Sequence, residues 1–552
     1  MSRKISVILS MCLCLLMITG VLVGCQTQQP SPSASPATEQ KTPEATTEAP
    51  SPDPNTEHLR FTLFYPWSST IKTSDEVTDP SNELYDERWK TILDKFNLSI
   101  DYVLADGGTM VQTLRTQIAA GDMSDVMLAS GITVQEYKDY GEQSALKFLP
   151  PDALDKYPNI KRNIMSLSAP QLFQASNGQY VCLPRSLDRR GVNSDYFFMM
   201  IYRKDLALQA GIQPMDACTP QQLFDMYTTI HQTFPDMPVF SSIWPTAIYQ
   251  LGLWTCSPEA LGFYLDKNTG KYEYGPSLPE TLEGIKWYKK FYDAGFMPKD
   301  FLNTQAYGAT AEFSTGKLFS YFNGADVAFL SSIRTMFKTD NPSMDPAACV
   351  DTFLLTKPDG TYLMHDWGNG SGEYVFSPKM DDAKFARILS LFDYLMSDEG
   401  VALCNYGVEG KDYVNSGDKL VSIRQKDANG NYIPFSGADK LGVPCILQAV
   451  VPQSDIAEAN PHIDEATRTR VAYLFKLRMD QPHYIQSYDA KMMMYTSEPL
   501  KKCALDSMGE INKLIIQESA ETIEAAWQKW LDDNKPLWQA ALDDLNANLL
   551  NK

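Results

Sequence analysis

Aromatic and short polar side chains stand at positions in this sequence where they could hold a sugar. The 552 residues include 9 Trp and 28 Tyr. Aromatic faces cover the C–H sides of a pyranose ring, and planar polar groups bond to its hydroxyls. Ligands in open α/β sheets lie beyond the carboxyl ends of the strands. We therefore expect ligand-binding residues after predicted strands or in loops: Tyr65, Trp67, Asp106, Ser130, Arg185, Trp244, Asn323, Trp367 and Asn369.

Each of these residues has a structural alternative. A tryptophan can simply pack in the core, and a polar residue can cap a helix, close a turn or form a salt bridge. Trp254 lies in a loop-like stretch and is a weaker candidate. Four other tryptophans lie on stripes with helical spacing, and we interpret them as core residues: Trp89, Trp287, Trp527 and Trp530.

Motifs for catalysis or for a metal are absent from the sequence. It contains no Gly-x-Ser-x-Gly, no His-Glu-x-x-His and no P-loop, and its five histidines are isolated. The segments 266–270 and 427–431 loosely resemble calcium loops, but both lack the glutamate at the twelfth position. We interpret both as turns. The sequence therefore predicts a protein that is not an enzyme and that has no metal and no cofactor.

The elements that must position the candidate residues alternate between strands and helices. Residues 59–65, 99–103 and 125–129 are typical of strands, and helical stripes lie between them at 82–96 and 111–121. This order predicts a parallel sheet with right-handed crossovers. An apolar strand at 197–202, a hairpin turn at 266–270 and helices after Thr219 and Ser277 follow. The chain from about 466 to 550 is mostly helical in pattern.

Charge and cysteine usage narrow the class of protein. The net charge of −20 makes nucleic acid or an anionic membrane surface an unsuitable main partner, because both attract basic patches. Seven cysteines after residue 25 are scattered without metal-ligand spacing. Their pairing stays open, although burial as small apolar residues is the simpler interpretation.

The first 57 residues read as a targeting signal and a tether. Arg3 and Lys4 precede an uncharged, mostly apolar run from 5 to 23, and Leu22-Val23-Gly24-Cys25 resembles the bacterial lipobox. We expect a signal peptide over 1–24 and lipidation of Cys25; an uncleaved membrane span is the alternative. Of residues 26–57, 17 are Pro, Ser or Thr, which predicts a disordered tether over 25–57.

Several motifs together resemble the extracellular solute-binding proteins of family 1, the lipoprotein receptors of ABC transporters for sugars. The matching segments are Ile118-Ala-Ala-Gly-Asp-Met-Ser-Asp-Val126, Asn177-Gly-Gln-Tyr-Val-Cys-Leu-Pro184, Ile201-Tyr-Arg-Lys-Asp-Leu206, Phe313-Ser-Thr-Gly-Lys317 and Asn405-Tyr-Gly-Val-Glu-Gly410. The last of these resembles a long-chain subgroup from Gram-positive bacteria. It adds Glu409 to the candidate ligand-binding residues, whereas Arg203 and Asp205 in the third segment are interpreted as structural.

The resemblance implies an α/β, two-lobed periplasmic-binding-protein type II fold, with a hinge and a ligand cleft between the lobes. Lobe 1 would comprise 58–195 and about 373–435, and lobe 2 would comprise 196–372 and about 436–552. The crossovers should lie near 190–200 and 370–376, where glycines 370 and 372 suit a hinge.

The function that the resemblance implies is capture of a carbohydrate, with an oligosaccharide as the expected ligand, for delivery to the permease subunits of an ABC importer. The protein would be a monomer, anchored by lipid at the extracellular face of the cell membrane. The alternatives are a secreted carbohydrate-active enzyme and a receptor of the same fold that binds peptides or reports to a sensor.

Overall fold

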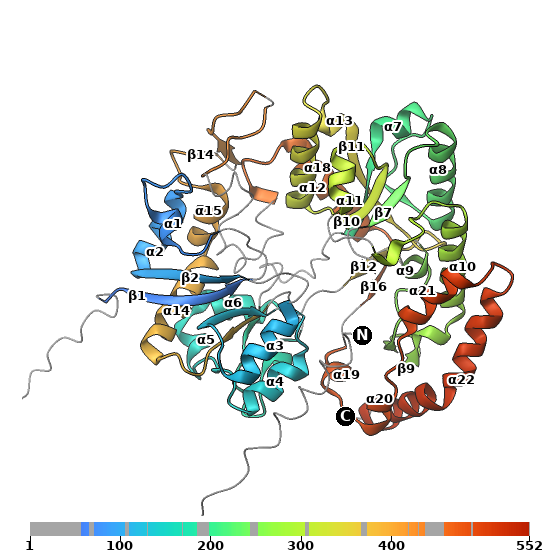
Figure 1. The fold of residues 1–552 in the computed structure, drawn as a ribbon, viewed down its shortest axis with the longest axis horizontal. Helices are drawn as coiled ribbons and strands as arrows, with labels where there is room; N and C mark the ends of the chain where they lie inside the picture. Colours follow the sequence, from blue (N-terminus) through green and yellow to red (C-terminus); the bar gives the residue numbers. More distant parts are fainter. Residues whose placement is uncertain are drawn as a thin grey trace, which may run out of the picture. The chain divides into compact units, whose positions relative to one another are not determined.

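The structure of the chain is a computed structural model (Figure 1). It describes residues 57–65, 71–104, 110–129, 131–167, 169–184, 198–242, 252–303, 308–365, 373–417, 419–428, 430–436, 458–486 and 489–550. The chain divides into two units, Met1–Pro52 and Asp53–Lys552, and all described residues belong to the second. The predicted signal peptide, Cys25 and most of the tether therefore lie outside the described residues.

The first five-stranded sheet has the order β2-β1-β3-β13-β4. Both β2 and β3 pair with β1 in parallel, as the alternating pattern predicts, whereas β13 is antiparallel to β3 and to β4. The sheet is therefore mixed, because a strand from far along the chain enters it in the opposite direction. Its strands are β1 (Leu59–Tyr65), β2 (Leu98–Leu104), β3 (Val126–Ala129), β4 (Leu183–Pro184) and β13 (Glu373–Phe376).

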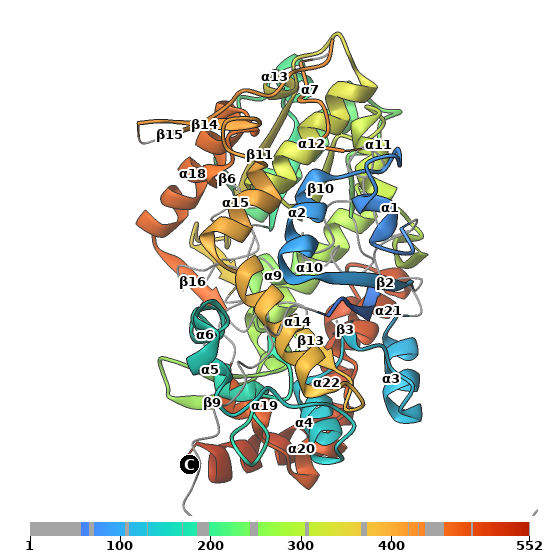
Figure 2. The same ribbon diagram turned by 90° about the vertical axis from the view of Figure 1, so that its left-hand side faces the viewer.

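One hydrophobic core surrounds this sheet. The stripe predicted from sequence buries Trp89, Ile92 and Phe96 on α2, which begins after its N-cap Asp86. Helix α2 packs against α14 and α15 (Figure 2). The helices of this part are α1 (Asp75–Thr78), α2 (Glu87–Phe96), α3 (Met110–Ala120), α4 (Val134–Glu142), α5 (Ala153–Lys156), α6 (Pro158–Met165), α14 (Asp382–Leu395) and α15 (Asp398–Tyr406), with a 3-10 turn at Pro170–Phe173.

The second five-stranded sheet has the order β6-β11-β5-β10-β7. Its central strand β5 is antiparallel to both neighbours, β10 and β11, while the two outer pairs are parallel. Its strands are β5 (Phe198–Arg203), β6 (Ala217–Cys218), β7 (Phe240–Ser242), β10 (Ser320–Gly324) and β11 (Val350–Leu355).

The central strand β5 contributes to two separate cores. Met200 and Tyr202 belong to one hydrophobic cluster, and Met199 and Ile201 belong to another. Successive side chains of a strand point to opposite faces, so each face of the sheet has its own core. This arrangement explains why residues 197–202 read as a continuous apolar run rather than as an alternating one.

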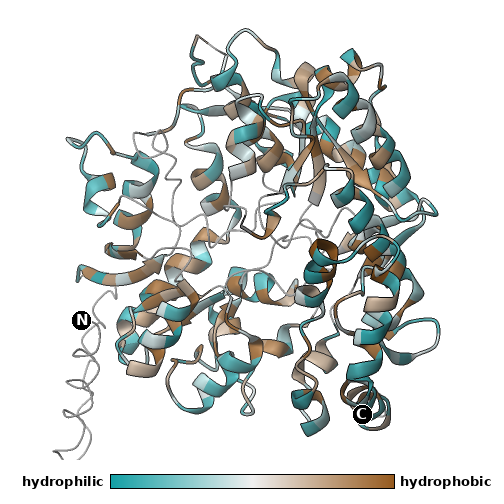
Figure 3. Cartoon of the chain, turned by 45° about the vertical axis from the view of Figure 1, so that its right-hand side comes forward, coloured by the Kyte–Doolittle hydropathy of each residue, from teal (hydrophilic) through white to brown (hydrophobic). Residues whose placement is uncertain are grey.

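Helices and short hairpins complete the second part, and several helices show hydrophobic residues along one side and hydrophilic ones along the other (Figure 3). The helices are α7 (Lys204–Gln209), α8 (Pro220–Thr233), α9 (Leu253–Cys256), α10 (Pro279–Asp293), α11 (Gly308–Ser314), α12 (Val327–Asp340), α13 (Pro346–Cys349), α18 (Glu465–Asp480), α19 (Ala490–Met494), α20 (Glu498–Lys502), α21 (Ser507–Gln517) and α22 (Ile523–Asp544). Short helical turns lie at Gly275–Ser277, Phe301–Asn303 and Leu545–Leu549.

Three two-stranded sheets complete the described structure. They join β8 (Phe263–Asp266) to β9 (Lys271–Tyr274), β14 (Tyr413–Ser416) to β15 (Lys419–Ser422), and β12 (Tyr362–His365) to β16 (His483–Gln486). The first is the hairpin predicted at 266–270, and Gly270 N donates to Asp266 O across its turn at 2.8 Å. The helical end of the chain is also confirmed, by α18 to α22.

The chain passes between the two sheets twice. It leaves the first sheet after Pro184 and enters the second at Phe198, then returns between His365 and Glu373. Glycines 370 and 372 lie outside the described residues. The lobe limits at 195 and 372 stay predictions.

Buried thiols, not disulfides, account for several of the cysteines. Cys182, Cys218, Cys256 and Cys349 are buried thiols. Burial raises the pKa of each, to about 12 for Cys256, so none is a reactive thiolate at neutral pH. Cys445 is outside the described residues. In the part of the chain that the structure describes, none of the helices could span a bilayer.

Candidate functional site

Most of the predicted ligand-binding residues lie outside the described residues. Four of them follow, in the sequence, the carboxyl ends of four strands that run in the same direction in the first sheet: β1, β2, β3 and β4. That relation to the strands is the reason for predicting them, and their role stays a prediction. The residues outside the described part are Trp67, Asp106, Ser130, Arg185, Trp244, Trp367 and Asn369.

Tyr65 lies at the carboxyl edge of the first sheet. It is the last residue of β1 and pairs with Leu104, the last residue of β2. The side chain is partly buried against the first core. Its position at a strand end fits a ligand-contacting role.

Glu373 is a carboxylate at the same edge that the sequence reasoning did not select. It is the first residue of the antiparallel strand β13, opposite Ala129 and Pro184 at the ends of their strands. The Tyr137 hydroxyl lies 2.8 Å from Glu373 Oε2 and 2.6 Å from Ala129 O. Burial, together with the charge of Glu373, raises the pKa of Tyr137, so this phenol remains a donor. Only the reversed direction of β13 brings Glu373 here.

Asn323 lies near the carboxyl end of β10 in the second sheet, opposite Met199. It is 6% exposed, and its Oδ1 accepts a hydrogen bond from Gly324 N at 2.7 Å. Three residues after Asn323, Asp326 caps α12 by accepting from Phe329 N at 2.9 Å. Burial raises the pKa of Asp326 to about 6. This edge therefore carries a buried amide and a buried carboxyl that titrates in mildly acidic solution.

Glu409 lies in the turn that precedes β14 and is exposed. Its carboxylate accepts a hydrogen bond from the Asn415 side chain, within the same hairpin. The three described candidates therefore belong to three different elements. Trp254 is 4% exposed, and its ring meets the edge of Phe322 with centroids 6.4 Å apart, which is a core position.

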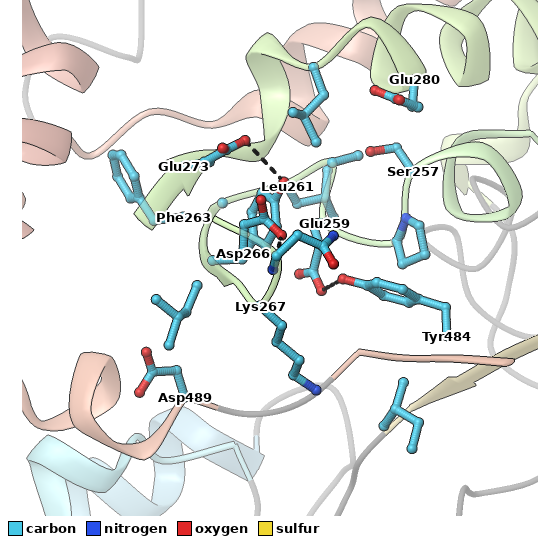
Figure 4. A pocket seen from close by; sticks show the side chains of 18 of the residues that line it. Ser257, Glu259, Leu261, Phe263, Asp266, Lys267, Glu273, Glu280, Tyr484 and Asp489 are labelled. Atoms are coloured by element: carbon cyan, nitrogen blue, oxygen red, sulfur yellow. Dashed lines mark hydrogen bonds between the residues drawn. The ribbon is translucent and has the colours of Figure 1, made fainter. Parts of the chain in front are cut away.

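A cavity of about 1210 Å³ opens beside the β8–β9 hairpin, and we call it the hairpin pocket (Figure 4). Its walls come from the end of α9 and the segment after it, from β8 and β9, from β16 and from the start of α19. Its aromatic rings are those of Phe263, Tyr264 and Tyr484. Its carboxylates are those of Glu259, Asp266, Glu273, Glu280 and Asp489.

Tyrosine hydroxyls hold three of these carboxylates in place. Tyr484 donates to Glu259 Oε1 at 2.6 Å, Tyr264 donates to Glu273 Oε2 at 3.3 Å, and Tyr272 donates to Asp489 Oδ2 at 2.6 Å. Burial and the neighbouring carboxylates raise the pKa of each of these tyrosines. Each phenol therefore keeps its proton and fixes the orientation of the carboxylate that accepts its hydrogen bond.

The two segments that loosely resemble calcium loops are turns. The Asp266 carboxylate accepts from Asn268 N at 3.0 Å and from Thr269 N at 3.3 Å within its own hairpin. Asp427 Oδ1 accepts from Asn431 N at 2.9 Å in the same manner. Among the described residues, no group of three or more His, Cys, Asp or Glu side chains could hold a metal ion.

Comparison with solved structures defines the class of this fold. The chain superposes on an alginate-binding protein, AlgQ2 without calcium ion, with a TM-score of 0.62 and 14% identity, covering 90% of this chain and 99% of that one. It also superposes on the S. pneumoniae ABC-transporter substrate-binding protein FusA in complex with kestose, with a TM-score of 0.56, 15% identity and coverage of 89% and 98%. The fold is therefore the two-lobed α/β fold of substrate-binding proteins, as predicted.

Sequence comparison shows which known proteins this chain resembles. Residues 90–343 match the family model described as bacterial extracellular solute-binding protein. A curated relative, the polygalacturonan/rhamnogalacturonan-binding protein YtcQ of Bacillus subtilis (strain 168), is 23% identical over 360 residues, which are 62% of this chain. The match spans 66% of the length of YtcQ, just under two thirds. These findings confirm the resemblance to the extracellular solute-binding proteins that the sequence motifs indicate.

Proposed function

We propose that this protein captures an oligosaccharide outside the cell and delivers it to the permease of an ABC importer. The observation that carries the proposal is the match of residues 90–343 to the extracellular solute-binding proteins, within a two-lobed fold. Proteins of this fold close their lobes on a ligand by hinge motion and release it on opening. Capture without chemistry fits the absence of catalytic motifs from the sequence.

The relatives and the site support a carbohydrate as the ligand. YtcQ is named for polygalacturonan and rhamnogalacturonan, AlgQ2 for alginate, and FusA was solved with kestose. In this chain, Tyr65 and Glu373 lie at the carboxyl edge of the first sheet, and the hairpin pocket combines aromatic rings with oriented carboxylates. Both provide the apolar faces and planar acceptors that sugars need.

A thermal-shift screen of the full-length protein against oligosaccharides, with peptides as controls, tests the proposal. A ligand at about 100 times its Kd adds about 2.7 kcal/mol to the free energy of unfolding, which is a measurable shift. We expect an oligosaccharide to bind and to be recovered unchanged by chromatography. Consumption of the sugar would establish an enzyme instead, and binding of peptides alone would establish a peptide receptor.

Variants of the predicted tryptophans test where the sugar lies. Trp67→Ala and Trp367→Ala should each raise the Kd about tenfold, because each removes one apolar face from the ligand. Trp530→Phe on α22 is the control, since that ring stacks on Trp527 at a centroid distance of 4.8 Å. Unchanged affinity in both tryptophan variants would move the sugar away from the strand ends.

Anchoring at Cys25 is a further part of the proposal. A lipid-modified cysteine followed by a Pro/Ser/Thr-rich tether would hold the protein at the outer face of the membrane. Cys25→Ser should move the protein from the membrane fraction to the medium, measured by fractionation and immunoblotting. If the variant stays in the membrane fraction, the uncleaved apolar run at 5–23 is the anchor.

A further inference from the structure

The hairpin pocket has a pronounced excess of negative charge. Among the described residues that line it, five are carboxylates and two are lysines, Lys267 and Lys357. Lys267 lies in the exposed turn of the hairpin, and Lys357 Nζ lies 5.8 Å from the centroid of the Tyr484 ring. Figure 4 shows Glu259, Asp266 and Glu273 grouped around the hairpin, with Asp489 across the opening. A ligand in this pocket therefore meets a negative electrostatic field.

Among the described residues, phenols donate hydrogen bonds to three carboxylates of the pocket region. A phenol orients a carboxylate and supplies one hydrogen bond, but it leaves the charge in place, whereas a lysine or arginine would neutralise it. Glu259, Glu273 and Asp489 each have such a phenol partner. A carboxylate can accept several hydrogen bonds, and the phenol uses one of them.

We infer that the hairpin pocket binds an uncharged oligosaccharide and rejects polyuronates. This inference rests on the proposed function and adds a ligand class to it. Oriented carboxylates accept hydrogen bonds from sugar hydroxyls, and the Phe263, Tyr264 and Tyr484 rings provide apolar surface for the C–H faces. A uronate would place its own carboxylates next to the carboxylates that line the pocket, and these like charges would repel each other.

The size of the pocket favours an oligosaccharide over a single sugar. Pockets of about 300 to 1,000 Å³ enclose a drug-sized ligand. At about 1210 Å³, the hairpin pocket is larger than that range. The inference also separates this chain from two proteins that it resembles, since alginate and polygalacturonan, for which they are named, are polyanions.

Titration calorimetry on the full-length protein tests the inference with probes of equal length. The uncharged probes are cellohexaose, maltohexaose and mannohexaose, and the charged probes are the hexamers of galacturonate and mannuronate. We expect an uncharged hexamer to bind at least about tenfold more tightly than either uronate hexamer, because charge complementarity selects partners. Added salt should narrow that difference, because it screens exposed charges.

Variants of residues that line the hairpin pocket test whether the preference for uncharged hexamers arises there. Tyr264→Ala should weaken binding of the uncharged hexamer about tenfold, and Tyr484→Phe, which keeps the ring but releases Glu259, should weaken it about threefold. The double variant Glu259→Gln/Glu273→Gln should strengthen uronate binding about tenfold, because it removes two like charges while keeping side-chain size. Circular-dichroism melts check whether each variant folds. If Tyr264→Ala does not fold, the smaller change Tyr484→Phe provides the test.

Matched substitutions outside the pocket serve as controls. Tyr473 on α18 also donates to a carboxylate, Asp216 Oδ2 at 2.8 Å, so Tyr473→Ala removes an equivalent pair that does not line the pocket. Glu524 forms an exposed ion pair with Lys286 at 2.6 Å, so Glu524→Gln removes a charge elsewhere. Neither control should change the affinity for the uncharged hexamer.

The outcomes separate this inference from the proposed function. Uronate hexamers that bind as tightly as uncharged ones would overturn the inference and leave an oligosaccharide receptor. Binding of uncharged hexamers that the pocket variants change no more than the controls would also overturn it. If no hexamer of either panel binds, the proposed function and the inference both fail.

Discussion

Each of the two large sheets has five strands, but the strand that runs antiparallel to its neighbours lies at a different position in each sheet. In the first sheet the antiparallel strand β13 lies next to the edge strand β4, whereas in the second sheet β5 lies in the centre. The first sheet belongs to a single hydrophobic cluster, and the central strand of the second joins two. The antiparallel strand thus places Glu373 at the carboxyl edge of the first sheet, whereas in the second sheet it contributes buried side chains to two hydrophobic cores.

The two parts of the molecule also contain three matching kinds of local interaction, which differ in how deeply they are buried. Each contains a short-range ion pair between an arginine and an aspartate two residues apart, a carboxyl with a shifted pKa, and a helix with a capping box. The degree of burial differs within each pair of devices. Substitutions at these sites therefore test whether burial, rather than chemistry, determines the contribution of each.

The largest effect is expected at the ion pairs. Asp86 and Arg88 lie 2.6 Å apart with side chains 2% and 4% exposed, and Arg88 also donates to Cys404 O at 3.0 Å. Asp86→Ala should lower the free energy of unfolding by about 3 to 5 kcal/mol, because it removes the carboxylate that contacts a buried guanidinium. Urea unfolding measures the change.

The corresponding pair in the second part provides the comparison. Arg203 and Asp205 lie 2.6 Å apart, but the Asp205 side chain is 16% exposed, and the sequence predicts a structural role for both residues. Asp205→Ala should cost about 1 to 3 kcal/mol, because water reaches the remaining charge more easily. Equal losses in both variants would mean that burial does not separate the two pairs.

An intermediate effect, dependent on pH, is expected at Asp326. Burial raises its pKa from 3.8 to about 6, so between these values the folded state holds a proton that the unfolded state releases. Its contribution is fully present below about pH 4 and is lost as pH rises through 6, a change of about 3 kcal/mol. Asp326→Asn keeps a good N-cap and should abolish this loss, which denaturant unfolding at about pH 4 and about pH 7 measures.

Glu136 in the first part should respond to pH in the opposite direction. Its hydrogen bond and ion pair with Arg115, 2.7 Å long, lower its pKa from 4.5 to about 2. Its stabilisation is therefore present above 4.5 and is lost as pH falls through 2. Glu136→Gln should flatten the acid limb of the stability curve, and an unchanged limb would contradict this assignment.

The smallest effect is expected at the capping boxes. Thr219 accepts from Gln222 N at 3.3 Å at the start of α8, and Thr133 accepts from Glu136 N at 3.2 Å at the start of α4. Thr219→Ala should cost about 1 kcal/mol, while Thr219→Ser should be nearly neutral because it keeps the hydroxyl. Thermal melts distinguish the two variants, and equal melting temperatures would show that the cap contributes nothing.

Local structure was predictable from the sequence because its determinants are local. The spacing of Trp89, Ile92 and Phe96 identifies the buried face of α2, although Tyr85 of the same stripe precedes the helix, since Asp86 caps it. Thr219 and Pro220 locate the start of α8. The insertion of β13 between β3 and β4 depends on pairing across some 190 to 250 residues, which no local pattern encodes.

The candidate site was predictable only in part for the same reason. The strand-end rule selects Tyr65 and Asn323, and the structure places both near the ends of their strands. Glu373 was missed because it opens a strand, and the rule considers only residues that follow one. The hairpin pocket was missed because it joins the predicted turn at 266–270 to Tyr484 and Asp489, more than 200 residues later.

The strands of the second sheet lie, in the sequence, between two strands of the first sheet, and this order affects how the chain folds during synthesis. All strands of the second sheet lie between 198 and 355, inside the interval between β4 and β13 of the first. A chain that emerges from its amino terminus can therefore complete the second sheet before the first. Until residue 376 has emerged, β3 and β4 lack the strand that joins them, so chains truncated before that point expose unpaired strand edges that promote aggregation.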